Sequence, residues 1–148
     1  MGYIEDLRKV VGKRPLVLTG VGVIVINRDQ KVLLQKNFDG FWGIPGGFME
    51  LGESAEEAGR REVFEETGIL IGKLELVTVV SGKDDFRKLA NGDKYYSVTI
   101  VYATKDIVGG KLAADGVETT EVQFFEMNAL PKKISLGMTR IISKIENG

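Results

Sequence analysis

Three glutamates at helical spacing are the residues of this chain best placed to do chemistry. Glu62, Glu65 and Glu66 stand at positions i, i+3 and i+4, so on an α-helix their carboxylates point into one narrow arc. Like charges so placed repel each other. A hard cation such as Mg²⁺ or Mn²⁺ would offset the repulsion, and such ions bind a few carboxylate oxygens together with substrate phosphates. The spacing therefore indicates phosphoryl chemistry, with a solvated acidic helix face as the alternative that it leaves open.

Negative charge is concentrated around these glutamates. Residues 47–69 contain seven Glu and two Arg, a local charge of −5, whereas the whole chain has a net charge of −1. The remainder of the chain is therefore mildly basic. The net charge alone indicates no polyanionic partner.

Missing residue types narrow the chemistry further. The chain has no Cys, which excludes disulfide scaffolds, thiolate nucleophiles, zinc ribbons and iron–sulfur clusters. It also has no His, which excludes the Ser-His-Asp triad, imidazole acid–base catalysis and His-ligated metals. Catalysis must then use carboxylates, Lys, Tyr, Ser, Thr or a metal held by oxygens.

Length and composition favour one globular domain over residues 1–148. The chain is 43% hydrophobic and 28% charged, which excludes global disorder. Its longest apolar run, residues 21–26, is far shorter than the ~20 residues of a membrane helix. The N-terminus lacks secretory and myristoylation patterns, so we expect a soluble cytoplasmic protein.

Periodicity and turn residues predict interleaved helices and strands without a regular βαβ repeat. The expected elements are a short helix within the N-terminal segment 1–14, a hairpin of strands at 16–26 and 32–34, a loop at 38–47, a helix at 54–67, strands at 74–80, 95–103 and 122–125 with a polar link at 81–93, and a C-terminal helix at about 134–146. This pattern indicates the α+β class, with helices packed on the faces of a mixed sheet.

Clear boundaries delimit the helix that carries the glutamates. Ser54 is a good N-cap and Glu57 completes a capping box, while Gly68 stands where a left-handed C-terminal residue belongs. Small residues such as Ala58 and Gly59 share the arc of the carboxylates. Small side chains are typical of places where something approaches a helix closely.

The whole segment from Gly47 to Ile69 resembles the Nudix box. It matches G-x5-E-x7-R-E-U-x-E-E-x-G-U, with U aliphatic, at every specified position. The approach Phe41–Gly47 and the late segment 121–125 followed by Leu130-Pro131 are similar to Nudix hydrolases too, so the likeness covers residues 16–131. It implies an α/β/α sandwich with a mixed β-sheet between helices. It also implies metal-dependent hydrolysis of a diphosphate bond in a nucleoside diphosphate linked to another moiety, by attack of water at phosphorus.

The resemblance assigns roles to individual residues. It implies that Glu62, Glu65 and Glu66 bind Mg²⁺ or Mn²⁺ with help from the Gly46 carbonyl. Glu53 would lie near the metal through hydrogen bonds or water, and Arg61 would orient the carboxylates.

The sequence leaves the general base and the residues that contact the substrate undecided. Because the family does not fix the position of the general base, Glu62, Glu65, Glu118 and Glu121 are all candidates. We expect Trp42 to pack in the core and not to stack on a nucleobase. Of the two aromatic residues, Phe86 in the polar link is the one that we expect to contact the substrate.

The sequence does not identify the substrate. Nucleoside triphosphates, oxidised dNTPs such as 8-oxo-dGTP, and ADP-ribose are all compatible with the box. A non-catalytic nucleotide-sensing module and an RNA 5′-pyrophosphohydrolase are the alternative functions; RNA binding would require a basic groove, which the sequence permits without indicating it. We expect a small nucleotide as partner and no membrane, and a homodimer is compatible with the sequence.

Overall fold

The computed structural model describes residues 2–147. Its elements, in chain order, are α1 (Tyr3–Val11), β1 (Leu16–Val25), β2 (Lys31–Asn37), β3 (Trp42–Gly43), β4 (Gly46–Phe48), α2 (Ala55–Thr67), β5 (Ile69–Ile71), β6 (Glu75–Val80), the 3₁₀ turn η1 (Lys83–Asp85), β7 (Phe86–Lys88), β8 (Lys94–Thr104), β9 (Ile107–Gly110), β10 (Thr119–Glu126) and α3 (Leu136–Asn147).

A parallel pair of long strands forms the centre of the molecule. β1 pairs with β8 from Leu16 opposite Tyr95 to Val25 opposite Thr104. β4 pairs antiparallel with the other side of β1, and both β6 and β7 pair antiparallel with β8. A three-stranded sheet, β10-β2-β3, and the pair β5-β9 complete the structure. The main sheet is therefore mixed, as the sequence predicts.

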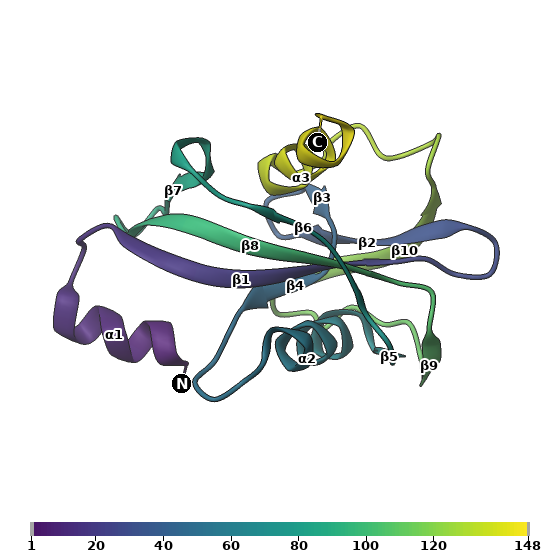
Figure 1. Cartoon of the computed structure of the whole chain (residues 1–148), viewed down its shortest axis with the longest axis horizontal. Coiled ribbons are helices and arrows are strands. Elements are labelled where there is room, and N and C mark those ends of the chain that lie inside the picture. The colour runs from purple at the N-terminus through teal and green to yellow at the C-terminus, as the bar shows by residue number, and fades with distance from the viewer. Residues whose placement is uncertain (1, 148) are drawn as a thin grey trace.

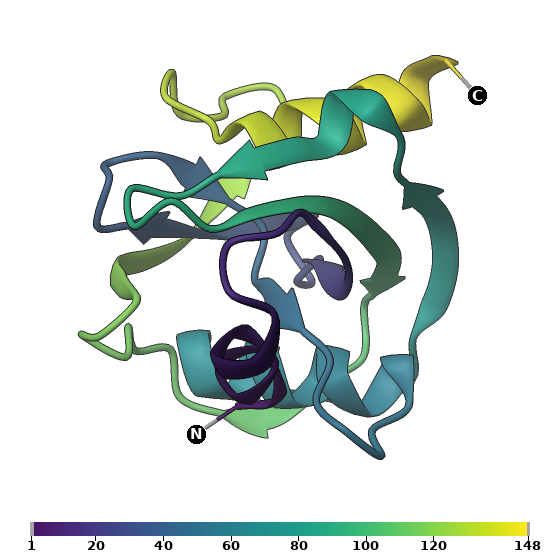
Figure 2. The same ribbon diagram turned by 90° about the vertical axis from the view of Figure 1, so that its left-hand side faces the viewer.

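Helices α2 and α3 lie on opposite sides of the sheets (Figure 1), and the view turned by 90° shows the same layers (Figure 2). On the α2 side, Val21 and Val23 of β1 pack in one core with Val63 of the helix. On the α3 side, Leu34 of β2 packs with Met138. This arrangement confirms the α+β class and the mixed sheet between helices.

The predicted hairpin of residues 16–26 and 32–34 is wrong. A single bridge, Ile26 to Val32, joins the two segments, and β1 and β2 belong to different sheets. The physical reason is that β1 is apolar on both faces, so it is stable only as a central strand covered by both helix layers. The predicted loop at 38–47 also contains β3 and the start of β4.

The boundaries predicted for α2 are confirmed. The Ser54 hydroxyl accepts a hydrogen bond from the Glu57 amide at 3.0 Å, and the Glu57 carboxylate accepts one from the Ser54 amide at 2.8 Å. Gly68 ends the helix in the left-handed conformation, at φ 79° and ψ 0°. Gly59 is buried against β1, where an added Cβ would lie 3.1 Å from the Val23 side chain. The small residues of the helix therefore serve close packing against the sheet.

The two terminal helices differ in how they are held. α1 buries none of its residues, and Arg8 anchors it by donating to the carbonyls of Arg14 and Lys94, both at 2.6 Å. α3 buries Met138 and Ile141 against the sheets. Within residues 2–147, no helix combines the length and apolar character that crossing a bilayer requires.

Asp115 organises the loop that leads into β10. One of its carboxylate oxygens accepts hydrogen bonds from the amides of Val117, Glu118 and Thr119, at 2.8 to 2.9 Å, and from the Thr119 hydroxyl at 3.1 Å. Burial works to raise the pKa of Asp115, but these hydrogen bonds outweigh it and hold the pKa below its usual range. The loop position of Glu118 therefore depends on Asp115.

We predict that Asp115→Ala lowers the free energy of unfolding by about 1 kcal/mol at pH 7, because three amides lose their acceptor. Asp115→Asn should cost less, since its amide oxygen still accepts. The carboxylate's contribution is fully present above the unfolded-state pKa of about 3.9 and is lost as pH falls through the lower folded-state pKa. Urea unfolding of wild type and Asp115→Asn should therefore converge at acidic pH; a constant difference would contradict this assignment.

Candidate active site

Arg61 gathers the acidic side chains of α2 and of the loop before it. Its Nε and Nη2 donate to the two oxygens of Glu53, at 2.5 and 2.9 Å. Its Nη1 donates to Glu62 at 2.7 Å and to Glu65 at 2.8 Å. Its Nη2 also reaches the Phe48 carbonyl at 3.2 Å, which ties the group to β4. One guanidinium thus holds three carboxylates in fixed relative positions.

Glu66 is held separately. Its side chain is buried, at 4% exposure, and one carboxylate oxygen accepts a hydrogen bond from the Gly46 amide at 3.0 Å. The contact of Gly46 with the acidic group therefore runs through its N–H. The part predicted for the Gly46 carbonyl stays a prediction.

Burial disfavours the charged forms of two of these carboxyl groups. It raises the pKa of Glu62 to about 7, although the Arg61 guanidinium opposes the rise, and the charges of Glu65 and Glu118 add to it. Burial also raises the pKa of Glu66. Hydrogen bonds from Arg61, by contrast, lower the pKa of Glu53. Arg61 therefore favours the charged form of Glu53, whereas burial dominates at Glu62.

Gly47 lets β4 approach the acidic helix. A Cβ on this residue would lie 2.5 to 2.7 Å from the carboxylate atoms of Glu62, so any side chain here would displace the Glu62 carboxylate from its present position. The glycine predicted from the box therefore has a steric reason. It brings backbone directly against a carboxylate.

The carboxylate oxygens of the acidic residues are suitable ligands for a divalent cation, although they do not converge on a common position. Within the part of the chain that the structure describes, no three acidic side chains form a ready-made metal site. Arg61 lies between Glu62 and Glu65, and Glu66 turns toward Gly46. The pKa of Glu62 is raised, so a nearby cation would stabilise its charged form. Carboxylate oxygens are also the ligands that Mg²⁺ and Mn²⁺ prefer.

The two loop acids considered as general base differ in position. Glu118 lies near both carboxyl groups: its charge works to raise the pKa of Glu62, and a side-chain hydrogen bond with it works to raise the pKa of Glu66. Glu121 instead forms an ion pair with Lys36 at 3.3 Å on the surface of the β2–β10 pair. Only Glu118 of the two is thus shown to act electrostatically on the acidic group.

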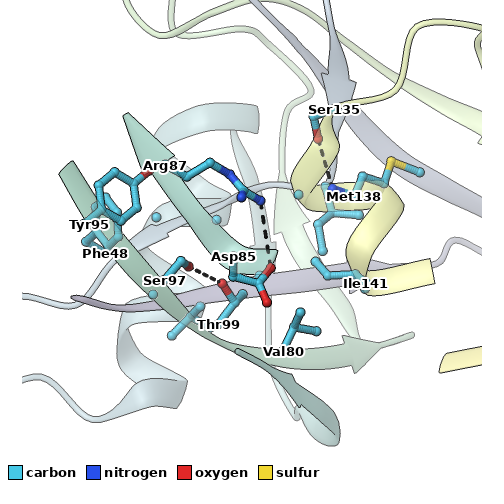
Figure 3. A pocket seen from close by; sticks show the side chains of 17 residues that line it. Phe48, Val80, Asp85, Arg87, Tyr95, Ser97, Thr99, Ser135, Met138 and Ile141 are labelled. Atoms are coloured by element: carbon cyan, nitrogen blue, oxygen red, sulfur yellow. Dashed lines mark hydrogen bonds and ion pairs between the residues drawn. The ribbon is translucent and has the colours of Figure 1, made fainter. Parts of the chain in front are cut away.

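A cavity of about 230 Å³ lies on the other side of the glycine strand (Figure 3). Gly46 and Gly47 of β4 line it together with Gly20 and Gly22 of β1. These two positions face the same side of the strand, so the absence of their side chains opens the space. The cavity thus adjoins the strand that contacts the carboxylates.

The walls of the cavity combine apolar and polar groups. Met138 and Ile141 of α3 contribute the apolar side, and Phe48 meets Tyr95 edge to face with ring centroids 5.3 Å apart. Asp85 supplies a carboxylate that is only 3% exposed. These features are typical of small-molecule sites, in which apolar walls carry a few oriented polar groups.

Asp85 is held between two arginines. Arg140 of α3 donates from Nε and Nη2 to its two oxygens, both at 3.3 Å. Arg87 forms an ion pair with Asp85 at 3.9 Å (Figure 3). On β8, the hydroxyls of Ser97 and Thr99 lie 2.8 Å apart along the same cavity. None of these residues is among the site residues predicted from the sequence. The only signal for them was the period-two spacing of Ser97 and Thr99 on a predicted strand.

Both aromatic residues weighed for substrate contact lie outside the cavity lining. Trp42 packs edge to face on Phe125, with centroids 4.9 Å apart, in the core beside α3. Phe86 packs on Tyr96 with centroids 5.0 Å apart, while its neighbours Asp85 and Arg87 line the cavity. The alternation of side chains along β7 turns Phe86 to the other face. The expectation that Phe86 meets the substrate is therefore not supported.

Comparisons with known proteins agree with this geometry. A family model described as a NUDIX domain matches residues 17–145. The chain is 38% identical over 112 residues to an ADP-ribose pyrophosphatase of Methanocaldococcus jannaschii, covering 73% of this chain but only 62% of that protein. It is 35% identical over 133 residues to a Bacillus subtilis protein named, provisionally, an 8-oxo-dGTP diphosphatase, covering 87% and 80% of the two chains. The structure of a MutT NUDIX hydrolase from Burkholderia pseudomallei superposes with a TM-score of 0.73 at 26% identity, over 87% of this chain and 98% of that one.

We predict that Glu62→Gln weakens Mn²⁺ binding by at least about tenfold, because it removes a charged ligand candidate from the buried side of the group. Isothermal titration calorimetry of the metal-free protein measures the affinity directly. Glu56→Gln is the matched control, since Glu56 lies on the same helix but is exposed and away from Arg61. Equal Mn²⁺ affinities of the two variants would contradict the role of Glu62.

Proposed function

The chain belongs to the Nudix hydrolase family, and from this membership we propose that it hydrolyses the diphosphate bond of a nucleoside diphosphate linked to another group, using Mg²⁺ or Mn²⁺. The observation that carries the proposal is the cluster of carboxyl groups held around Arg61 directly behind Gly47, a residue that also lines a cavity of nucleoside dimensions. A diphosphate that crosses this glycine strand has its metal-binding oxygens beside the acidic helix and its nucleoside in the cavity.

Each acidic residue has a distinct part in this proposal. Glu62, Glu65 and Glu66 would hold the cation, which neutralises the diphosphate and activates an attacking water when bound. Arg61 keeps Glu62 and Glu65 oriented, and Glu53 fixes Arg61 from the loop side. Glu118 is our choice of loop acid to accept the proton of that water, because it lies beside Glu62 and Glu66 whereas Glu121 is paired with Lys36.

Turnover of nucleotides tests the enzymatic proposal. Wild-type protein with Mg²⁺ should hydrolyse nucleotides from a panel of nucleoside triphosphates, 8-oxo-dGTP and ADP-ribose, and mass spectrometry of the products names the bond cleaved. Glu65→Gln should reduce kcat by two or more orders of magnitude, on the scale seen when a group that stabilises the transition state is removed. Nucleotide binding without any turnover by the wild type would favour the non-catalytic sensing module instead.

The cavity favours a guanine-type base over adenine. Its volume of about 230 Å³ is below the ~300–1,000 Å³ of sites for drug-sized ligands, so it suits a base or nucleoside and not a whole dinucleotide. A carboxylate has about four acceptor positions, and long bonds to Arg140 occupy two of those on Asp85. Guanine offers two adjacent N–H donors on one edge, whereas adenine offers one donor beside an acceptor that a carboxylate repels.

We predict that wild-type kcat/KM is higher for dGTP and 8-oxo-dGTP than for dATP and ADP-ribose. Asp85→Asn should shift this preference toward adenine by about 10- to 100-fold, because an amide presents one donor and one acceptor. Asp84→Asn is the matched control, since its side chain is exposed beside the same turn. An unchanged base preference in Asp85→Asn would remove Asp85 from base recognition while leaving the hydrolase assignment in place.

A further inference from the structure

Helix α1 is held in place by hydrogen bonds more than by packing. It lies apart from α2 and α3 (Figure 1), and none of its residues is buried. A cavity of about 500 Å³ is lined by Tyr3 and Ile4 of this helix together with Val17 of β1 and Met49 of the loop before α2. The first turn of α1 is therefore not closely packed against the sheet, and its position depends on its polar contacts.

Glu50, in the loop before α2, is the acceptor at the start of α1. The backbone N–H of Tyr3, the first residue of the helix, donates to Glu50 Oε1 at 2.9 Å. The first amides of a helix have no acceptor within the helix, and a carboxylate is favoured there by the helix dipole. Gly2 lies against the same carboxylate, since a Cβ on it would be 3.1 Å from Glu50 Oε2. The Glu50 side chain therefore ties the start of α1 to the loop.

The backbone of Glu50 in turn holds Glu53. Its N–H donates to Glu53 Oε1 at 2.9 Å, and its carbonyl accepts from the Glu53 amide at 3.2 Å. Gly52 lets the chain turn between them, at a φ of 81° that favours glycine. Both the main chain and the carboxylate of Glu53 are therefore positioned by Glu50.

These contacts lead directly to the guanidinium at the centre of the acidic group. Glu53 Oε1, which accepts from the Glu50 amide, also accepts from Arg61 Nη2 at 2.9 Å. Arg61 then donates to Glu62 at 2.7 Å and to Glu65 at 2.8 Å. A continuous series of hydrogen bonds thus joins the first amide of α1 to the carboxylates of α2.

We infer that Glu50 is a positioning residue of the proposed active site: its side chain fixes the loop to the start of α1, and its backbone amide holds the Glu53 carboxylate that orients Arg61. The effect on turnover rests on the proposed function, whereas the effect on the position of Glu53 does not. Residue 50 is an unspecified position of the Nudix box, and α1 precedes residues 17–145, which the family model matches. The inference therefore adds to the site an element that neither the box nor the family model includes.

The test removes the contact between Tyr3 and Glu50 from either side. Tyr3→Pro deletes the amide donor and keeps the helix, because proline is favoured at the first helical position and Gly2 before it is already extended, at φ −90° and ψ 167°. Tyr3→Ala is the matched control, since it removes the same side chain and retains the amide. Glu50→Ala deletes the acceptor, whereas Glu50→Gln keeps an oxygen that accepts from the Tyr3 amide.

We expect Tyr3→Pro and Glu50→Ala each to lower kcat by about tenfold, because misplacement of catalytic groups slows turnover even when the substrate contacts are intact. KM should change less than kcat, since neither residue lines the cavity proposed to hold the nucleoside. Tyr3→Ala and Glu50→Gln should stay near the wild type. The double variant Tyr3→Pro/Glu50→Ala should be no slower than the slower single variant, because both changes remove the same hydrogen bond.

NMR of the metal-free protein gives a second readout that needs neither metal nor nucleotide. In the wild type, the hydrogen bond to Glu53 protects the Arg61 Nε–H from exchange with solvent. This proton should exchange faster in Tyr3→Pro and Glu50→Ala than in Tyr3→Ala and Glu50→Gln. The Tm should be similar in all four variants, because α1 buries no residue.

The outcomes separate the inference from the proposed function. Equal kcat and equal exchange of the Arg61 Nε–H in all four variants would overturn the inference and leave the hydrolase proposal in place. A lower Tm of Tyr3→Pro and Glu50→Ala with unchanged kcat and exchange would give their contact a purely structural role and overturn it as well. If the wild type turns over no nucleotide, the proposed function fails, and the exchange measurement alone decides whether Glu50 positions Glu53.

Discussion

The burial of several carboxylates around one guanidinium is the constraint on which the rest of the structure depends. Separately, each carboxylate would prefer water, and burial raises the pKa of Glu62 for this reason. Arg61 offsets part of that cost by bonding to Glu53, Glu62 and Glu65 at once. A bound cation would offset the remaining cost of burying these carboxylates. The proposed metal-bound diphosphate would therefore stabilise this region of the fold.

The glycine strand β4 joins this charged region to the cavity. It must be narrow, because β1 lies against one side of it and the Glu62 carboxylate against the other. Gly46 contributes its amide to Glu66, and both glycines line the cavity. A side chain at Gly47 would displace the Glu62 carboxylate from its present position. The absence of a side chain therefore lets β4 adjoin both the Glu62 carboxylate and the cavity.

Some of this could be predicted from the sequence because the signals are local. The ends of α2 follow from Ser54 and Gly68, and the shared direction of its carboxylates follows from helical spacing. The parallel pairing of β1 with β8 could not be predicted in the same way, because it joins segments about 80 residues apart and depends on which strand is apolar on both faces. The hairpin prediction failed at this point, since it assumed that neighbours in sequence are neighbours in the sheet.

Asp85, a polar residue outside the box, is hard to predict for a related reason. It belongs to no motif, and it acquires its meaning from the two arginines that the fold places beside it. The box predicts the chemistry by itself because its residues are close together in the sequence, mainly on α2 and the loop before it. The cavity proposed to hold the base is instead lined by residues of η1, β8 and α3, which no short stretch of sequence brings together. The box therefore carries no information about the base, because the groups proposed to read it lie on other elements of the fold.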